Sequence, residues 1–279
     1  MRSASEITRK AKSNLALALK LLPKERRDDM VVFYAYCRTM DDLADEPDRP
    51  LAERAAALAS WIDGVENQFT SPDDFQREVE ELKLRHQIPG NLLGAIARGC
   101  KMDLEIQRFD NWEALEDYIW HVAGAVGLVS IRLFGCKNPE SEAYALTLAK
   151  ALQLTNILRD IHEDLNNGGR IYLPLQDLKQ FDYGVEDLQS KLGDARFIEL
   201  MEFEAARAED YFDQADRLLP MEDFQELIAA RVMGDIYRTL LKKMRDDGFR
   251  VFDKRYELSK ARKLALLSKQ LVARNHMIE

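Results

Sequence analysis

Apolar and polar positions recur with a helical period along most of the 279-residue chain. Stretches rich in Ala, Leu, Glu, Lys and Arg lie between breaks marked by Pro and Gly, and the alternating, β-branched pattern of strands is nearly absent. The fold class is therefore predicted to be all-α. We expect helices over residues 6–21, 24–45, 51–68, 73–86, 91–107, 112–134, 140–165, 185–219 with a break, 222–247 and 259–274.

No stretch of the sequence is typical of a domain boundary. The chain contains no linker, no low-complexity run and no internal repeat. We therefore expect residues 1–279 to form one helical domain.

The charge of the chain limits its partners. With 40 basic and 49 acidic side chains, the formal charge is −9. Nucleic-acid binding is not expected, because it needs a surplus of Lys and Arg to meet the phosphates. Small molecules that carry phosphate remain open as ligands.

Cysteine usage and hydropathy favour a cytoplasmic protein. Cys37, Cys100 and Cys136 show no CxxC spacing, which fits a reducing compartment. No apolar segment of the signal-peptide kind follows the basic N-terminus. The most apolar stretch without formal charge, residues 118–131, is shorter than the roughly 20 residues of a membrane span. Any membrane contact is expected to be peripheral, and the basic run over residues 242–263 is a candidate for it.

An acidic cluster ends the second predicted helix. Asp41 and Asp45 share a helix face with Asp42 beside them, and Arg38 lies one turn earlier. Carboxylates at this spacing repel each other, and they oppose the helix dipole at a C-terminus. A divalent cation with oxygen ligands would relieve both effects. A solvated acidic helix end is the alternative interpretation.

A second polar stripe lies on the helix predicted over residues 140–165. Gln153, Asn156, Asp160 and Asp164 recur at steps of three and four between apolar neighbours, which is typical of a helix that lines a polar pocket in a bundle. Two such stripes suggest facing walls that hold Mg²⁺. Because Mg²⁺ in proteins usually takes one or two carboxylates together with substrate phosphates, the implied ligand is a phosphate or diphosphate.

At these residues the chain resembles the squalene and phytoene synthase family, the head-to-head prenyl synthases of the isoprenoid synthase fold. Within the family it looks most like the bacterial presqualene diphosphate synthase branch. The blocks that carry the resemblance, in family order, are Leu22-Pro23 with Arg27, Tyr34-Ala-Tyr-Cys-Arg38-Thr-Met-Asp41-Asp42-Leu-Ala-Asp45, Gly99-Cys-Lys-Met-Asp103, Tyr118-Ile-Trp-His-Val122-Ala-Gly124-Ala-Val-Gly127, Leu152-Gln153-Leu-Thr-Asn156-Ile-Leu-Arg159-Asp160-Ile-His-Glu163-Asp164 and Gly169-Arg170-Ile-Tyr172-Leu-Pro174.

The resemblance implies a helical bundle with a central active-site cavity and a prenyltransferase that condenses two farnesyl diphosphates to presqualene diphosphate. Mg²⁺ would help the diphosphate to leave. The metal ligands implied are Asp41, Asp42, Asp45, Asn156, Asp160 and Asp164. The catalytic residues implied are Arg38, Arg159 and Arg170, which would clamp phosphate oxygens, with Tyr34 and Tyr118. The substrate-binding residues implied are Lys12, Ser13, Val122, Val126, Gly127, Gln153, Tyr172, Tyr237 and Arg250.

One departure from the family affects substrate selection. Many relatives carry Lys-Ser-Phe before the Leu-Pro element, whereas this chain has Lys12-Ser13-Asn14 and so loses an aromatic ring from the expected pocket.

Several alternatives remain open. Phytoene synthase would act on two geranylgeranyl diphosphates in the same fold. A full squalene synthase would also use NADPH, although the sequence shows no Gly-rich nucleotide motif. A catalytically inactive assembly factor is the non-enzymatic alternative, and it would be expected to have lost its acidic clusters. The oligomeric state is not indicated by the sequence.

Overall fold

The computed structural model describes residues 17–46, 48–105 and 108–276, with the side chains described up to residue 273. Within these ranges the prediction of an all-α fold is confirmed, since helices account for the regular structure and an isolated bridge joins Arg108 to Ile171. The helices are η1 (Leu19–Leu21), α3 (Lys24–Asp45), α4 (Leu51–Glu66), α5 (Asp74–Arg85), α6 (Gly90–Glu105), α7 (Trp112–Ile119), η2 (Trp120–Gly124), α8 (Ala125–Phe134), α9 (Glu140–Asn166), α10 (Leu175–Gln180), α11 (Val185–Gln189), α12 (Ala195–Leu218), η3 (Met221–Asp223), α13 (Ile228–Asp246) and α14 (Lys260–His276).

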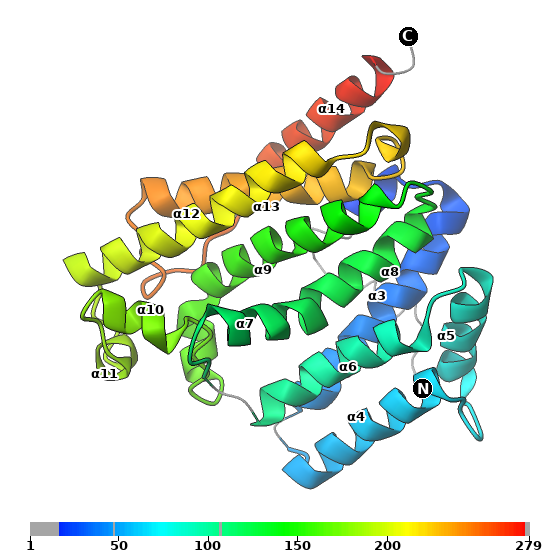
Figure 1. Ribbon diagram of the computed structural model, residues 1–279, viewed down its shortest axis with the longest axis horizontal. Coiled ribbons are helices and arrows are strands. Elements are labelled where there is room, and N and C mark those ends of the chain that lie inside the picture. Colours follow the sequence, from blue (N-terminus) through cyan, green and yellow to red (C-terminus); the bar gives the residue numbers. More distant parts are fainter. Residues whose placement is uncertain (1–16, 47, 106–107, 277–279) are drawn as a thin grey trace.

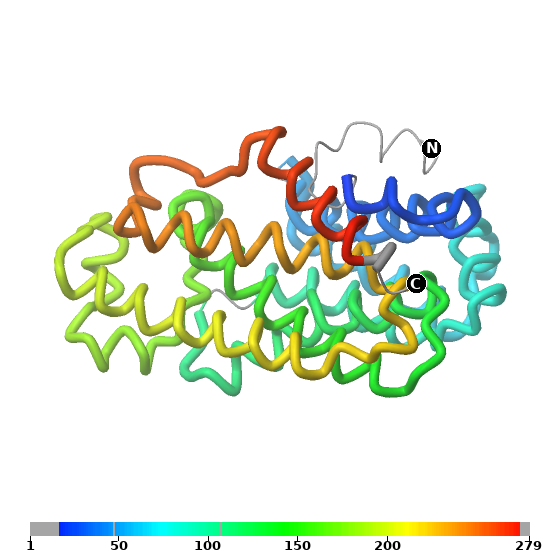
Figure 2. Tube along the Cα trace, turned by 90° about the horizontal axis from the view of Figure 1, so that it is seen from above, coloured from blue at the N-terminus to red at the C-terminus, as the bar shows by residue number. Residues whose placement is uncertain are grey.

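The long helix α9 organises the bundle. Figure 1 shows it crossing the middle of the molecule, with α12 and α13 along one side and α8, α6 and α4 following on the other. Helix α9 packs directly against α12, α8 and η2, and α6 packs against α4 and α3. The view from above places α3 and α14 toward one side of the molecule and α12 toward the other (Figure 2). A central helix packed on several sides can present one face to an enclosed cavity.

The stretch predicted as one helix over residues 112–134 is interrupted by the π-helical turn η2. Such turns insert one extra residue and occur often at functional sites. Glycines let neighbouring helices approach this region closely: a Cβ on Gly99 would lie 2.7 Å from Cγ1 of Val122, and one on Gly127 would lie 3.2 Å from the carbonyl oxygen of Ala145. The short helix α10 was not predicted.

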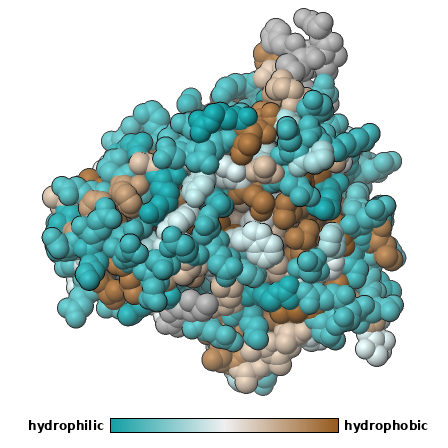
Figure 3. Space-filling model, viewed as in Figure 1, coloured by the Kyte–Doolittle hydropathy of each residue, from teal (hydrophilic) through white to brown (hydrophobic). Residues whose placement is uncertain are grey.

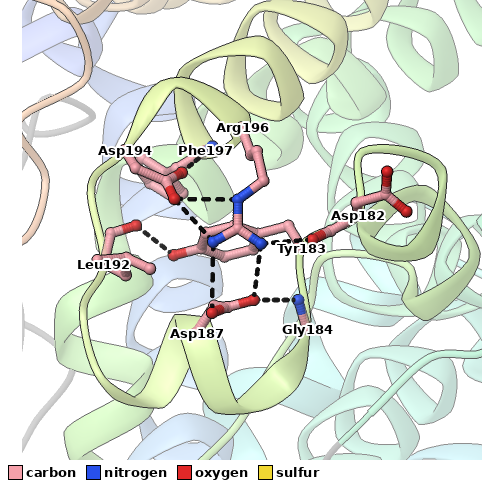
Figure 4. Close-up of polar contacts among 8 residues, drawn as sticks. All are labelled: Asp182, Tyr183, Gly184, Asp187, Leu192, Asp194, Arg196 and Phe197. Atoms are coloured by element: carbon pink, nitrogen blue, oxygen red, sulfur yellow. Dashed lines mark hydrogen bonds and ion pairs between the residues drawn. The ribbon is translucent and has the colours of Figure 1, made fainter.

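The break predicted within residues 185–219 separates α11 from α12, and a polar network stabilises it (Figure 4). Arg196 pairs with Asp194 at 2.7 Å and with Asp187 at 3.4 Å. Asp194 also caps α12 by accepting a hydrogen bond from the backbone N–H of Phe197. This corner is built from contacts local in sequence.

On the face shown in Figure 3, hydrophilic residues cover most of the surface, and hydrophobic residues gather in smaller groups toward the centre and right. Among the described residues, none of the helices combines the length and the apolar character that crossing a bilayer requires.

Candidate active site

A cavity of about 480 Å³ lies between α3, η2, α8, α9 and α13. Polar side chains line one end of it, among them Asp41, Gln153, Asn156 and Tyr237. The rest of the lining is mainly apolar, with residues of α3, α8 and α9 facing one another across the cavity. A small-molecule site of this kind accepts an apolar chain with a polar head.

Some of the residues predicted from the sequence lie together at this cavity. Eight of the residues named from the sequence line this cavity: Tyr34, Asp41, Val122, Val126, Gly127, Gln153, Asn156 and Tyr237. Cys37, Phe33 and Met30 of α3 also line the cavity and were not named. They precede Asp41 at helical steps, which is the signal that places them on the same face.

The acidic cluster of α3 contains its own counter-ion. Arg38 donates to Asp41 at 2.8 Å and lies 2.6 Å from Asp42, and about half of each side chain is exposed. Loss of hydration raises the pKa of Asp41 to about 6; Arg38 opposes this shift, and Asp45 and the other nearby carboxylates add to it. No basic residue occupies the last turn of α3. The helix end therefore presents a surplus of negative charge toward the cavity.

The acidic cluster of α9 is divided into two electrostatic environments. Burial would raise the pKa of Asp160, but hydrogen bonds from Arg159 and from Arg255, the latter at 2.9 Å, hold it below its usual range. Burial and the charge of Asp160 raise the pKa of Asp164 to about 7 against the attraction of Arg170. One carboxylate of this wall is thus neutralised by arginines, and the other is not.

Arg170 and Asp103 connect the two clusters. The chain turns sharply after α9 because Gly168 and Gly169 adopt left-handed backbone angles, with φ of 78° and 73°. This turn brings Arg170 back to Asp45 of α3, at 3.1 Å. Asp103 of α6 raises the pKa of both Asp41 and Asp164, so its carboxylate lies near both walls. The family block that ends in Asp103 was the sequence signal for this residue, although it was not named as a site residue.

Two of the predicted tyrosines hold Asp103. The hydroxyl of Tyr172 donates to it at 2.8 Å and that of Tyr118 at 3.2 Å, and the two rings stack with centroids 5.3 Å apart. Burial raises the pKa of Asp103, and the tyrosine hydrogen bonds oppose that shift. Tyr118 is buried and does not line the large cavity, so its observed contact is with this carboxylate.

The loop after α13 contains two arginines, and the sequence indicated Arg250 but not Arg255. Arg250 pairs with Asp253 at 2.9 Å and is 59% exposed, and it does not line the cavity. Arg255 of the same loop reaches Asp160 and also lies 3.4 Å from Glu163. Lys12 and Ser13 lie outside the described residues.

Comparison with known proteins identifies the family. Residues 8–262 match the model of the squalene/phytoene synthase family. The chain is 33% identical to a 15-cis-phytoene synthase of Synechococcus elongatus over 94% of its own length and 89% of the relative's. It is 32% identical to a presqualene diphosphate synthase of Rhodopseudomonas palustris over 91% of both chains. The chain belongs to the squalene/phytoene synthase family.

The solved structures agree with this assignment. A dehydrosqualene synthase determined with a bound ligand superposes with a TM-score of 0.82 at 27% identity, over 98% of this chain and 95% of that one. As a member of the squalene/phytoene synthase family the protein is a prenyltransferase, and the reaction it supports is the head-to-head condensation of prenyl diphosphates.

The donor set of the two walls suits the divalent cation on which this family typically depends. The side-chain oxygen Oδ1 of Asn156 is buried and has no hydrogen-bond partner among the described residues. Burial raises the pKa of Asp41 and of Asp164, and neighbouring carboxylates add to both shifts. Within the described part of the chain, however, no three His, Cys, Asp or Glu side chains converge closely enough to hold an ion by themselves. Mg²⁺ in proteins generally takes few protein ligands and completes its shell with water and phosphate oxygens.

Proposed function

We propose that the protein joins two farnesyl diphosphates to form presqualene diphosphate in a Mg²⁺-dependent reaction. The observation that carries the proposal is the apolar cavity, whose polar end is lined by Asp41 of the α3 cluster and by Gln153 and Asn156 of the α9 stripe. An apolar chain would fit the cavity, and a metal-bound diphosphate would fit its polar end.

The residues of the two acidic clusters and the arginines paired with them would take complementary roles. Asp41, Asp42 and Asp45 of α3, and Asn156, Asp160 and Asp164 of α9, would bind Mg²⁺ through oxygen. When bound, the metal supplies Lewis-acid stabilisation of the leaving diphosphate. Arg38 and Arg170 each pair with a carboxylate of α3. Each would turn its planar guanidinium toward phosphate oxygens once the metal neutralises that carboxylate.

The apolar cavity suits a reaction that passes through a carbocation. Loss of diphosphate from the donor leaves an allylic cation, which the double bond of the acceptor attacks, and loss of a proton then closes the cyclopropane of the product. The apolar lining excludes water that would otherwise trap the cation. The ring of Tyr34 lines the cavity beside Asp41, and an aromatic face stabilises a nearby cation by about 0.5–2 kcal/mol.

Phytoene synthase is the second candidate, because relatives of that name are as similar to the chain as the presqualene diphosphate synthases are. The test incubates the purified protein with Mg²⁺ and either farnesyl or geranylgeranyl diphosphate, with and without NADPH, and identifies the lipid product. We expect presqualene diphosphate from farnesyl diphosphate in both NADPH arms. Squalene formed only with NADPH would assign the reductive step to this protein, and phytoene as the dominant product would overturn the proposal.

A further inference from the structure

Tyr144 and Leu148 of α9 line the catalytic cavity on the N-terminal side of Asn156. The residues of α9 that line the cavity run from Asn156 at the acidic end to Tyr144 at the other. This span of twelve residues corresponds to about 18 Å along a helix. A prenyl chain whose diphosphate lies at Asn156 would therefore point its tail toward Tyr144 and Leu148.

A second cavity, of about 240 Å³, lies directly behind these two residues. Tyr144 and Leu148 line both cavities, and they alone are shared between the two sets of lining residues. Figure 1 shows α12 and α13, which contribute most of the second cavity, running beside α9. Its lining combines apolar Phe212 and Leu219 with charged Arg231 and Asp235. One layer of side chains therefore separates an apolar compartment from a partly charged one.

Tyr144 is suited to this position. It is 3% exposed, and burial raises the pKa of its hydroxyl well above the usual range. The charged groups that act most strongly on the hydroxyl are Arg231, Asp216 and Asp235, all of which line the second cavity. The hydroxyl therefore lies toward the charged compartment, which leaves the ring to face the prenyl cavity.

Leu148 lies close to the backbone of α13 at Gly234. A Cβ built on Gly234, which lines the second cavity, would lie 3.4 Å from Cδ1 of Leu148, in ordinary van der Waals contact. Leu148 is 6% exposed. The absence of a side chain at Gly234 leaves open the space into which a longer tail would extend if Leu148 were shortened.

We propose that Tyr144 and Leu148 form the wall that sets the longest prenyl chain the enzyme accepts. This inference rests on the proposed function in that it takes a prenyl diphosphate as substrate, but it does not depend on which chain length the wild-type protein prefers. A tail one prenyl unit too long would have to displace the wall or enter the compartment that contains Arg231 and Asp235, and both cost free energy.

The test measures kcat/KM for a series of diphosphates with ten-, fifteen-, twenty- and twenty-five-carbon chains. The wall variants are Tyr144→Ala and Leu148→Ala. We expect each to raise the ratio of kcat/KM for the chain one unit longer than the wild-type optimum, relative to that optimum, by about tenfold or more, the range in which hydrophobic pockets discriminate.

Two matched variants control the experiment. Tyr144→Phe keeps the ring and should keep the wild-type length limit. Leu219→Ala enlarges the second cavity without opening the wall, because Leu219 lines only that cavity, and it should also keep the limit. Circular dichroism and melting temperature establish that each variant is folded. If Tyr144→Ala does not fold, Leu148→Ala and the milder Leu148→Val carry the test.

The outcomes separate this inference from the proposed function. A wild-type optimum of twenty carbons would overturn the farnesyl assignment, while a shift to twenty-five carbons in the variants would still support the wall. Folded, active wall variants with the wild-type length ratio would overturn the wall. A shift in Leu219→Ala as large as that in Leu148→Ala would overturn it as well.

Discussion

The acidic clusters of α3 and α9 share a pattern in sequence, two aspartates four residues apart near a helix C-terminus, but they differ in their surroundings. On α3, Arg38 alone faces Asp41 and Asp42, and it is half exposed. On α9, Asp160 is held by Arg159 and Arg255. Asp164, four residues on, has the charge of Asp160 beside it and a pKa raised to about 7.

The difference shows that equal spacing does not give equal charge. Arginines already in place favour the anionic form of Asp160, whereas burial and neighbouring carboxylates disfavour the anionic forms of Asp41 and Asp164. Each acidic cluster therefore contains a carboxylate that is repelled by neighbouring carboxylates. A bound cation would relieve that repulsion, which favours metal binding. We infer that the two acidic clusters bind Mg²⁺ tightly only together with a diphosphate. The predictions below test that inference from the largest expected effect to the smallest.

The largest effect is expected from removing one carboxylate of each wall. Asp41→Ala and Asp160→Ala should each lower kcat by about 10³-fold, since Lewis-acid stabilisation contributes several kcal/mol to the barrier. Product formation from farnesyl diphosphate and Mg²⁺ measures the loss. Asp246→Ala, at the end of α13 in an exposed pair with Lys242, is the matched control and should keep wild-type activity. Unchanged turnover in both Asp41→Ala and Asp160→Ala would rule out the metal assignment.

A smaller effect is expected from the two arginines of the loop after α13. Arg255→Ala removes a hydrogen bond from Asp160 and should lower kcat/KM by about 10-fold or more, the value of one charged hydrogen bond. Arg250→Ala breaks only the exposed pair with Asp253 and should change kcat/KM by less than about twofold. The family resemblance favoured Arg250, so the reverse result would show that the loop moves when substrate binds.

The smallest effect is a pH-dependent change in stability that has opposite signs at two positions of α9. The folded pKa of Asp164 is raised, so its contribution to stability is present below the unfolded value and is lost as the pH rises through about 7. The folded pKa of Asp160 is lowered, so its contribution is present above the unfolded value and is lost as the pH falls through the folded one.

Melting curves in the presence of a chelator measure this difference. At pH 8, Asp164→Asn should melt a few degrees above the wild type and Asp160→Asn a few degrees below, at about 2–4 °C per kcal/mol for a chain of this size. For Asp164→Asn the gap should shrink as the pH falls from 8 toward 4. Shifts of the same sign in both variants would contradict the distinction drawn between the two carboxylates.

Much of the fold could be predicted from the sequence because its signals are local. Prolines and helical periodicity gave the range of α3 to the residue, and the two acidic stripes followed from spacing along single helices. The π-helical turn η2 and the six-residue helix α10 were missed, because a short helix has little period and a π-helical turn has no distinct composition.

The contacts that complete the site could not be predicted in the same way. Arg255 meets Asp160 across 95 residues and Arg170 meets Asp45 across 125, and no periodicity encodes such distances. Asp103 is one carboxylate among 49 acidic residues until the fold places it between the walls. The roles assigned to the site residues stay predictions until the variants are measured.

The most direct test of the account is calorimetric titration of Mg²⁺ into the protein with and without a farnesyl diphosphate analogue whose bridging oxygen is replaced by sulfur. We expect weak Mg²⁺ binding to the protein alone and tight binding with the analogue, lost in either Asp41→Asn or Asp164→Asn. Equally tight binding without the analogue, or tight binding that survives both substitutions, would contradict the claim that the two walls close around a metal-bound diphosphate.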